Sequence, residues 1–85
     1  MQIDFTEIAD QHLKLFLKSG NKSILKKVVQ LLKAIEENPY EGIGKPEQLK
    51  HELTGLWSRR INTEHRLIYE ITEHVIVVHS LKGHY

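Results

Sequence analysis

A break at Asn38-Pro39 separates two halves of the chain whose apolar residues follow different periods. Before the break, apolar residues recur at helical spacing up to Ser19 and again from Lys22 to Glu37. Thr6 is suited to cap the first of these helices, and Gly20-Asn21 interrupts the pattern between them. The short interruption predicts that the two helices form an antiparallel pair.

After the break the sequence changes to the alternating, β-branched composition of strands. Including one segment at the start of the chain, the predicted strands cover residues 2–5, 56–61, 65–71 and 74–80. Pro46 is expected to start a short helical turn that carries Glu47. The order β-α-α-β-β-β predicts an α+β fold, in which two N-terminal helices pack on one face of a small antiparallel sheet.

Length and composition limit the architecture and the kind of site. Eighty-five residues predict a single domain, residues 1–85, with a compact core. The lack of cysteine excludes disulfides and thiolate metal sites, and no apolar run nears the ~20 residues of a membrane helix. No leader-like segment begins the chain, so a cytoplasmic location is expected. A net charge of +1 is low for a nucleic-acid-binding domain, so any RNA contact must use a local patch.

Strand alternation predicts two arginines on the sheet face that points away from the helices. The apolar set of segment 65–71 should face the helices, which puts Arg66 on the open face. A tight hairpin then places Arg60 opposite Arg66, whereas Arg59 points toward the helices. Adjacent cations repel, so an anion such as a phosphate or the Glu47 carboxylate is expected between them. A register change of one residue would separate the pair.

Glu47, Arg66 and His84 together supply the groups that cleave RNA through its own 2′-hydroxyl. Glu47 can accept the hydroxyl proton, and Arg66 can stabilise a five-coordinate phosphorus through two parallel donors. His84, with an ordinary pKa near ~6.5, can protonate the departing 5′-oxygen. Each residue also fits a structural role: Glu47 at a helix start, Arg66 as a surface cation, His84 in a frayed terminus. The residues alone leave both interpretations open.

Three more residues are candidates for binding the substrate. Lys50 and Arg60 are expected to help neutralise the phosphate, and Tyr85 to stack on a base or orient the phosphate. His12 lies on the apolar stripe of the first helix and is expected to be partly buried. The remaining histidines show no accepted zinc-ligand spacing, so neither a metal nor another cofactor is predicted.

The run from Pro39 to Tyr69 resembles the YoeB/Txe family of bacterial type II toxin–antitoxin toxins. The resemblance rests on Gly-Lys-Pro-Glu, Trp-Ser-Arg-Arg-Ile and Glu-His-Arg-Leu within that run, and on the final His84-Tyr85. It spans essentially the whole chain, including its length and element order. The family is similar to the wider RelE-like ribonucleases, which implies two helices on one side of a small antiparallel sheet and the active site on the other.

The resemblance implies an endoribonuclease toxin that depends on the ribosome, cleaves mRNA in the ribosomal A site and inhibits translation. By position it implies these roles: Glu47 as general base, Arg66 as phosphate-stabilising residue, His84 as general acid, and Lys50, Arg60 and Tyr85 in support. It further implies the 70S ribosome, mRNA and a cognate antitoxin of the YefM/Axe type as partners. Such an antitoxin is partly disordered until it binds. A homodimer is compatible with the resemblance.

The predicted reaction is metal-independent cleavage that leaves a 2′,3′-cyclic phosphate and a 5′-hydroxyl. The alternative is a non-catalytic module that docks on the ribosome or on a partner protein through the same basic sheet face. Only the ribonuclease would yield cut message. A DNA-binding regulator is disfavoured, because neither a helix-turn-helix pattern nor a strongly basic helix is present.

Overall fold

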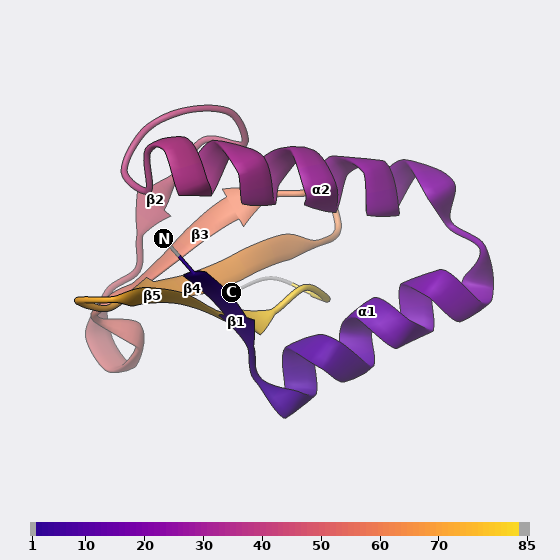
Figure 1. Cartoon of the computed structure of the whole chain (residues 1–85), viewed down its shortest axis with the longest axis horizontal. Coiled ribbons are helices and arrows are strands. Elements are labelled where there is room, and N and C mark those ends of the chain that lie inside the picture. Colours follow the sequence, from indigo (N-terminus) through magenta and orange to yellow (C-terminus); the bar gives the residue numbers. More distant parts are fainter. Residues whose placement is uncertain (1, 84–85) are drawn as a thin grey trace.

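Two helices lie against one face of a five-stranded sheet in the computed structural model, which describes residues 2–83 (Figure 1). The elements in chain order are β1 (Gln2–Phe5), α1 (Glu7–Ser19), α2 (Lys22–Glu37), β2 (Glu47–Gln48), the 3₁₀ turn η1 (His51–Leu53), β3 (Leu56–Arg60), β4 (Arg66–Ile71) and β5 (Val75–Ser80). The predicted α+β class is confirmed. Neither helix is long and apolar enough to cross a membrane, as judged over the described residues.

Local capping explains where the two helices begin and where α1 ends. The Thr6 hydroxyl accepts a hydrogen bond from the Ala9 amide, and the Asn21 side chain does the same for Ile24. Between the helices, Gly20 adopts a left-handed conformation with φ of 71°, which ends α1 at low cost. The predicted helix bounds are confirmed.

The strand order is β1-β5-β4-β3-β2, and the sheet is mixed rather than wholly antiparallel. Strands β2 to β5 pair antiparallel in the order expected for successive hairpins, but β1 pairs parallel with β5. Helices rather than a hairpin connect β1 to the rest of the sheet, so no tight turn imposes an antiparallel arrangement on it. The prediction of an antiparallel sheet was therefore wrong for the first strand.

The region after Pro46 is also not the predicted helical turn. Glu47 and Gln48 are extended and pair with Ser58 and Trp57 of β3, while the only turn of 3₁₀ helix in this region comes later, at η1. Pro46 tolerates both conformations, because its fixed φ suits an extended edge strand as well as a helix start. Pairing with β3 determines that residues 47–48 are extended, and this pairing cannot be predicted from the local sequence.

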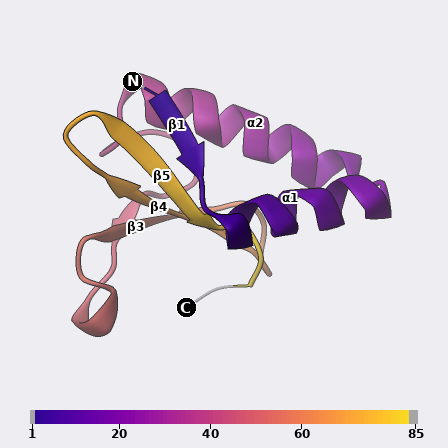
Figure 2. The ribbon, with the colours of Figure 1, turned by 60° about the horizontal axis from the view of Figure 1, so that its bottom comes forward.

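The two helices lie on one side of the sheet (Figures 1 and 2), and their buried apolar residues join the core there. The core combines Phe16, Leu31 and Ile35 from the helices with alternate strand residues such as Leu67 and Tyr69. The expected helix-facing side of β4 is thus confirmed. The opposite side of β3 and β4 lacks a helical layer, and the polar candidates of these strands lie there.

Candidate active site

Glu47, Arg60 and Arg66 line one hollow of about 210 Å³ on the open side of the sheet. We call it the carboxylate hollow; its lining residues are Lys45, Glu47, Leu49, Ser58, Arg60 and Arg66. Strands β2, β3 and β4 are consecutive neighbours in the sheet, which brings Glu47 level with Ser58 and sets Arg60 directly opposite Arg66. The predicted register of the two arginines is confirmed.

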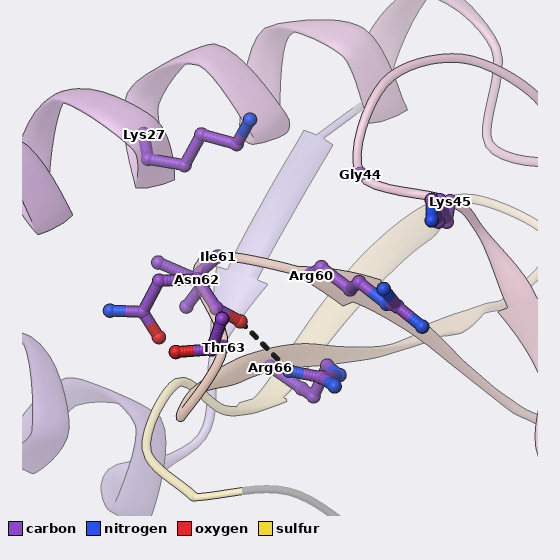
Figure 3. Close-up of a pocket in the computed structure, with 8 residues that line it drawn as sticks. All are labelled: Lys27, Gly44, Lys45, Arg60, Ile61, Asn62, Thr63 and Arg66. Carbon is purple, nitrogen blue, oxygen red and sulfur yellow. Dashed lines mark hydrogen bonds between the residues drawn. The ribbon is translucent and has the colours of Figure 1, made fainter.

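The two arginines extend to the same side of the β3–β4 hairpin (Figure 3). Arg60 is exposed, whereas Arg66 is half-buried and donates from Nη1 to the carbonyls of Asn62 (2.9 Å) and His65 (3.2 Å). These bonds hold one end of the Arg66 guanidinium against the hairpin turn. The geometry suits an anion that bridges the opposed cations.

Glu47 is exposed, and ion pairs within residues 2–83 do not involve it. Its carboxylate shares the hollow with cations without being held by any of them in a close pair. A carboxylate in that position can accept a proton from a bound hydroxyl.

Of the other three predicted residues, only Lys50 belongs to the described part of the chain, and it does not line the carboxylate hollow. Lys50 is exposed and precedes η1. His84 and Tyr85 lie outside the described residues. Gly83, the last described residue, accepts a hydrogen bond at its carbonyl from the Arg66 amide (2.8 Å).

Two histidines hold the segment after β5 in place. His12 Nδ1 accepts a bond from the Leu81 amide (3.1 Å), and His65 Nδ1 accepts one from the Gly83 amide (2.9 Å). An imidazole nitrogen that accepts carries no proton, so in each ring the neutral form has its proton on Nε2. Burial, followed by the nearby Lys82 and His65, lowers the pKa of His12 and favours this neutral form. The expected partial burial of His12 is confirmed.

A buried arginine fixes the loop that leads into β2. Arg59 is fully buried and donates to the Tyr69 hydroxyl (3.0 Å) as well as to three loop carbonyls, those of Asn38, Glu41 and Ile43. Burial raises the pKa of Tyr69, whose hydroxyl donates to the Pro39 carbonyl (2.8 Å). The backbone ahead of Glu47 is therefore tied to the same two strands that carry Arg60 and Arg66.

The family model described as "YoeB-like toxin of bacterial type II toxin-antitoxin system" matches residues 5–85. The chain belongs to this YoeB-like toxin family. A protein named toxin YoeB from Synechocystis is 47% identical over 85 residues, which cover 100% of this chain and 98% of the relative. The resemblance that the sequence motifs indicated is confirmed.

Solved structures of YoeB proteins have the same fold. A YoeB dimer from Staphylococcus aureus matches with a TM-score of 0.90 and 46% identity, covering 100% of this chain and 98% of that one. A YoeB–YefM complex from the same organism matches with a TM-score of 0.89 and 48% identity, at the same coverage. The structure of YafQ from Escherichia coli, only 18% identical, shares the fold with a TM-score of 0.80, covering 96% of this chain and 91% of that one.

The YoeB-like fold also places in the hollow two residues that the sequence had not predicted as site residues. Lys45 lines it from the loop, with a left-handed φ of 52° that is strained for a residue with a side chain. Ser58 lines it from β3, level with Glu47. Alternation from Arg60 could have identified Ser58, whereas the position of Lys45 depends on a loop path that no periodic pattern describes.

Proposed function

We propose that this chain is a toxin that cleaves mRNA in the ribosomal A site and thereby stops translation. The observation that carries the proposal is the shared hollow, in which Glu47 lies together with the opposed pair Arg60 and Arg66. A base and a phosphate-binding pair around one space are what 2′-hydroxyl attack requires. Membership in a toxin family agrees with this activity.

The proposed reaction proceeds by transfer of two protons. Glu47 removes the proton of the 2′-hydroxyl, and the 2′-oxygen forms a bond to the adjacent phosphorus. Arg66 and Arg60 stabilise the additional charge on the phosphoryl oxygens. The bond from phosphorus to the 5′-oxygen breaks, and His84 supplies the proton that this oxygen takes up. The products are a 2′,3′-cyclic phosphate and a 5′-hydroxyl.

The remaining assignments are secondary parts of the same proposal. Lys50 and Tyr85 assist in binding the RNA near the hollow. The hydrogen bond from the Arg66 amide to the Gly83 carbonyl supports the assignment of His84, because it ties the preceding residue to the backbone of the strand that carries the phosphate-binding side chain. Since a relative was solved as a YoeB–YefM complex and another as a YoeB dimer, we propose a cognate antitoxin of the YefM type and self-association for this cytoplasmic chain as well.

Mapping of 5′ ends on purified ribosomes stalled on a defined mRNA tests the proposal. The wild-type protein should cut the message in the A site, and Glu47→Gln should cut about 10²–10⁴ times more slowly, the usual cost of losing a general base. Glu52→Gln, an exposed carboxylate in η1, is the matched control and should cut at the wild-type rate. His84→Gln should lose activity to a similar extent.

Two results would contradict the mechanism. Wild-type cleavage by Glu47→Gln at equal ribosome occupancy would remove the proposed base. Continued cleavage of a message with a 2′-deoxy nucleotide at the cut position would exclude the 2′-oxygen as nucleophile. Ribosome binding without any cut by the wild-type protein would instead favour the non-catalytic binding module.

A further inference from the structure

A second and larger hollow, of about 360 Å³, adjoins the carboxylate hollow. We call it the lysine hollow, because Lys27 of α2 lines this hollow and does not line the carboxylate hollow. Its lining also includes Lys45, Arg60, Arg66 and the hairpin residues 61–63 (Figure 3). In the close-up, Lys27 reaches from α2, Lys45 from the loop and the arginines from the hairpin, around one space. Three separate parts of the fold thus contribute cations to it.

The lysine hollow has positive charge without a negative partner of its own. Among residues 2–83, its lining includes four cationic side chains and neither aspartate nor glutamate. The ion pairs within residues 2–83 join other residues, namely Lys14 with Asp10 and three histidines with glutamates. Opposed like charges such as Arg60 and Arg66 destabilise the free sheet. The four cations therefore reduce the stability of the free protein and favour the binding of an external anion.

The two hollows share three lining residues, Lys45, Arg60 and Arg66. These cations therefore lie between Glu47, which lines only the carboxylate hollow, and Lys27, which lines only the lysine hollow. An RNA strand carries a negative charge at every nucleotide, so a strand whose cleaved phosphate lies at the Glu47 end brings a neighbouring phosphate toward Lys27. The larger volume leaves room for part of a nucleotide besides its phosphate.

We propose that the lysine hollow is a second phosphate subsite, which binds the nucleotide next to the cleaved phosphodiester, with Lys27 as its distinguishing contact. The proposal deepens the proposed ribonuclease function and rests on it. Thr63 and Asn62 offer polar contacts to the sugar, and the buried Ile61 provides an apolar floor. An acidic protein segment is the competing occupant. RNA is favoured because three of the four cations are shared with the hollow that contains Glu47.

Binding of Lys27→Gln to ribosomes that carry chemically altered messages tests this subsite. The probe is an mRNA with a 2′-deoxy nucleotide at the cut position, so that it stays intact, and with single phosphates on either side replaced by neutral methylphosphonates. For the wild-type protein, one flanking replacement should weaken binding by about 3- to 10-fold, the effect of one charge-assisted contact. The same replacement should have no effect on Lys27→Gln.

Lys27→Gln should also bind the unaltered message about 3- to 10-fold more weakly, with a salt slope reduced by about 0.7, as for one phosphate contact on a single strand. Lys26→Gln is the matched control, since Lys26 is an exposed neighbour on α2 that does not line the hollow. It should bind like the wild type. Lys27→Arg should restore the sensitivity to the methylphosphonate, and equal melting temperatures verify that the variants are folded.

Each contrary outcome is distinct. If every methylphosphonate affects wild type and Lys27→Gln equally, Lys27 contacts ribosomal RNA or nothing, and the subsite is refuted. If Lys27→Gln weakens only antitoxin binding, the occupant is a protein segment and the proposal is again refuted. Because the probe mRNA is never cut, the loss of methylphosphonate sensitivity in Lys27→Gln can be measured even if the unmodified message is not cleaved. In that case the ribonuclease function fails and the phosphate subsite stands.

Discussion

At the scale of single residues, Arg59 and Arg60 show how adjacent cations acquire different tasks. Arg59 is fully buried, and its charge is compensated by a hydroxyl and three backbone carbonyls rather than by a carboxylate. Arg60 is exposed opposite Arg66 and lines both hollows. Because successive side chains of a strand point to opposite faces, Arg59 stabilises the loop and Arg60 is available to bind an anion.

Replacing each arginine by methionine should separate these tasks. Arg59→Met should lower the free energy of unfolding by about 2–4 kcal/mol, because several buried acceptors lose their donor. Arg60→Met should change it by less than about 0.5 kcal/mol, since that side chain is exposed and its removal relieves repulsion. Urea denaturation measures both. Similar values for the two variants would show that the contacts of Arg59 with the loop contribute little.

Periodicity accounts for the residue-scale predictions that are confirmed. Because strand side chains alternate, the sequence predicted Arg59 toward the helices and Arg60 opposite Arg66, and the register agrees. The hydrogen-bond partners of Arg59 were beyond prediction, since they are carbonyls of an irregular loop. The roles of Glu47, Arg66 and His84 remain predictions.

At the scale of elements, the loop between α2 and β2 determines the shape of both hollows. Gly44, in this loop, has a left-handed φ of 84°, and its carbonyl accepts the Arg60 amide. A Cβ at this position would lie 2.7 Å from Leu31 Cδ2 and 3.1 Å from Arg59 Cβ. The loop can approach α2 and β3 this closely only because the residue is glycine.

Gly44→Ala should therefore destabilise the fold by about 2–4 kcal/mol and displace Lys45 from the hollows, because overpacking adds to the backbone penalty. Gly20→Ala provides a matched control. Gly20 also has a positive φ, of 71°, but no atom lies within 4 Å of the added carbon, so only about 1 kcal/mol is expected. Thermal unfolding of the two variants measures the difference. Equal losses would mean that the close approach at Gly44 is relaxed without cost.

Elements with a regular period were predicted well, and those that depend on distant partners were not. The helices agree with the prediction, and strands β3 to β5 agree to within one residue at each end. The helical turn expected at Pro46 is instead strand β2, because pairing with β3 outweighs local preference. The parallel direction of β1 likewise depends on β5, more than 70 residues away.

At the scale of the whole molecule, His12 of α1 and His65, which precedes β4, hold the segment after β5 through their Nδ1 atoms. Since the pKa of His12 is lowered from its usual 6.5, the unfolded chain takes up a proton at a higher pH than the folded protein does. The free energy of unfolding should therefore fall as the pH decreases below 6.5, and level off once the folded His12 is also protonated. Urea denaturation at a series of pH values from about 8 to 5 measures this dependence.

Two asparagine variants identify the source of the pH dependence. His12→Asn retains an acceptor oxygen but cannot take up a proton, so its stability should vary less with pH. His74→Asn removes a histidine whose side chain is 86% exposed and should leave the dependence unchanged. An unaltered slope in His12→Asn would assign the effect to other groups.

The pairing of β1 with β5 has a consequence for biosynthesis. Within the sheet of residues 2–83, β1 is an edge strand that pairs with β5, so it waits for a partner that is translated more than 70 residues later. During translation the emerging polypeptide cannot close its sheet until residues 75–80 have left the exit tunnel. A growing chain thus lacks its complete sheet until β5 is available, on the very machine that the finished protein is proposed to attack.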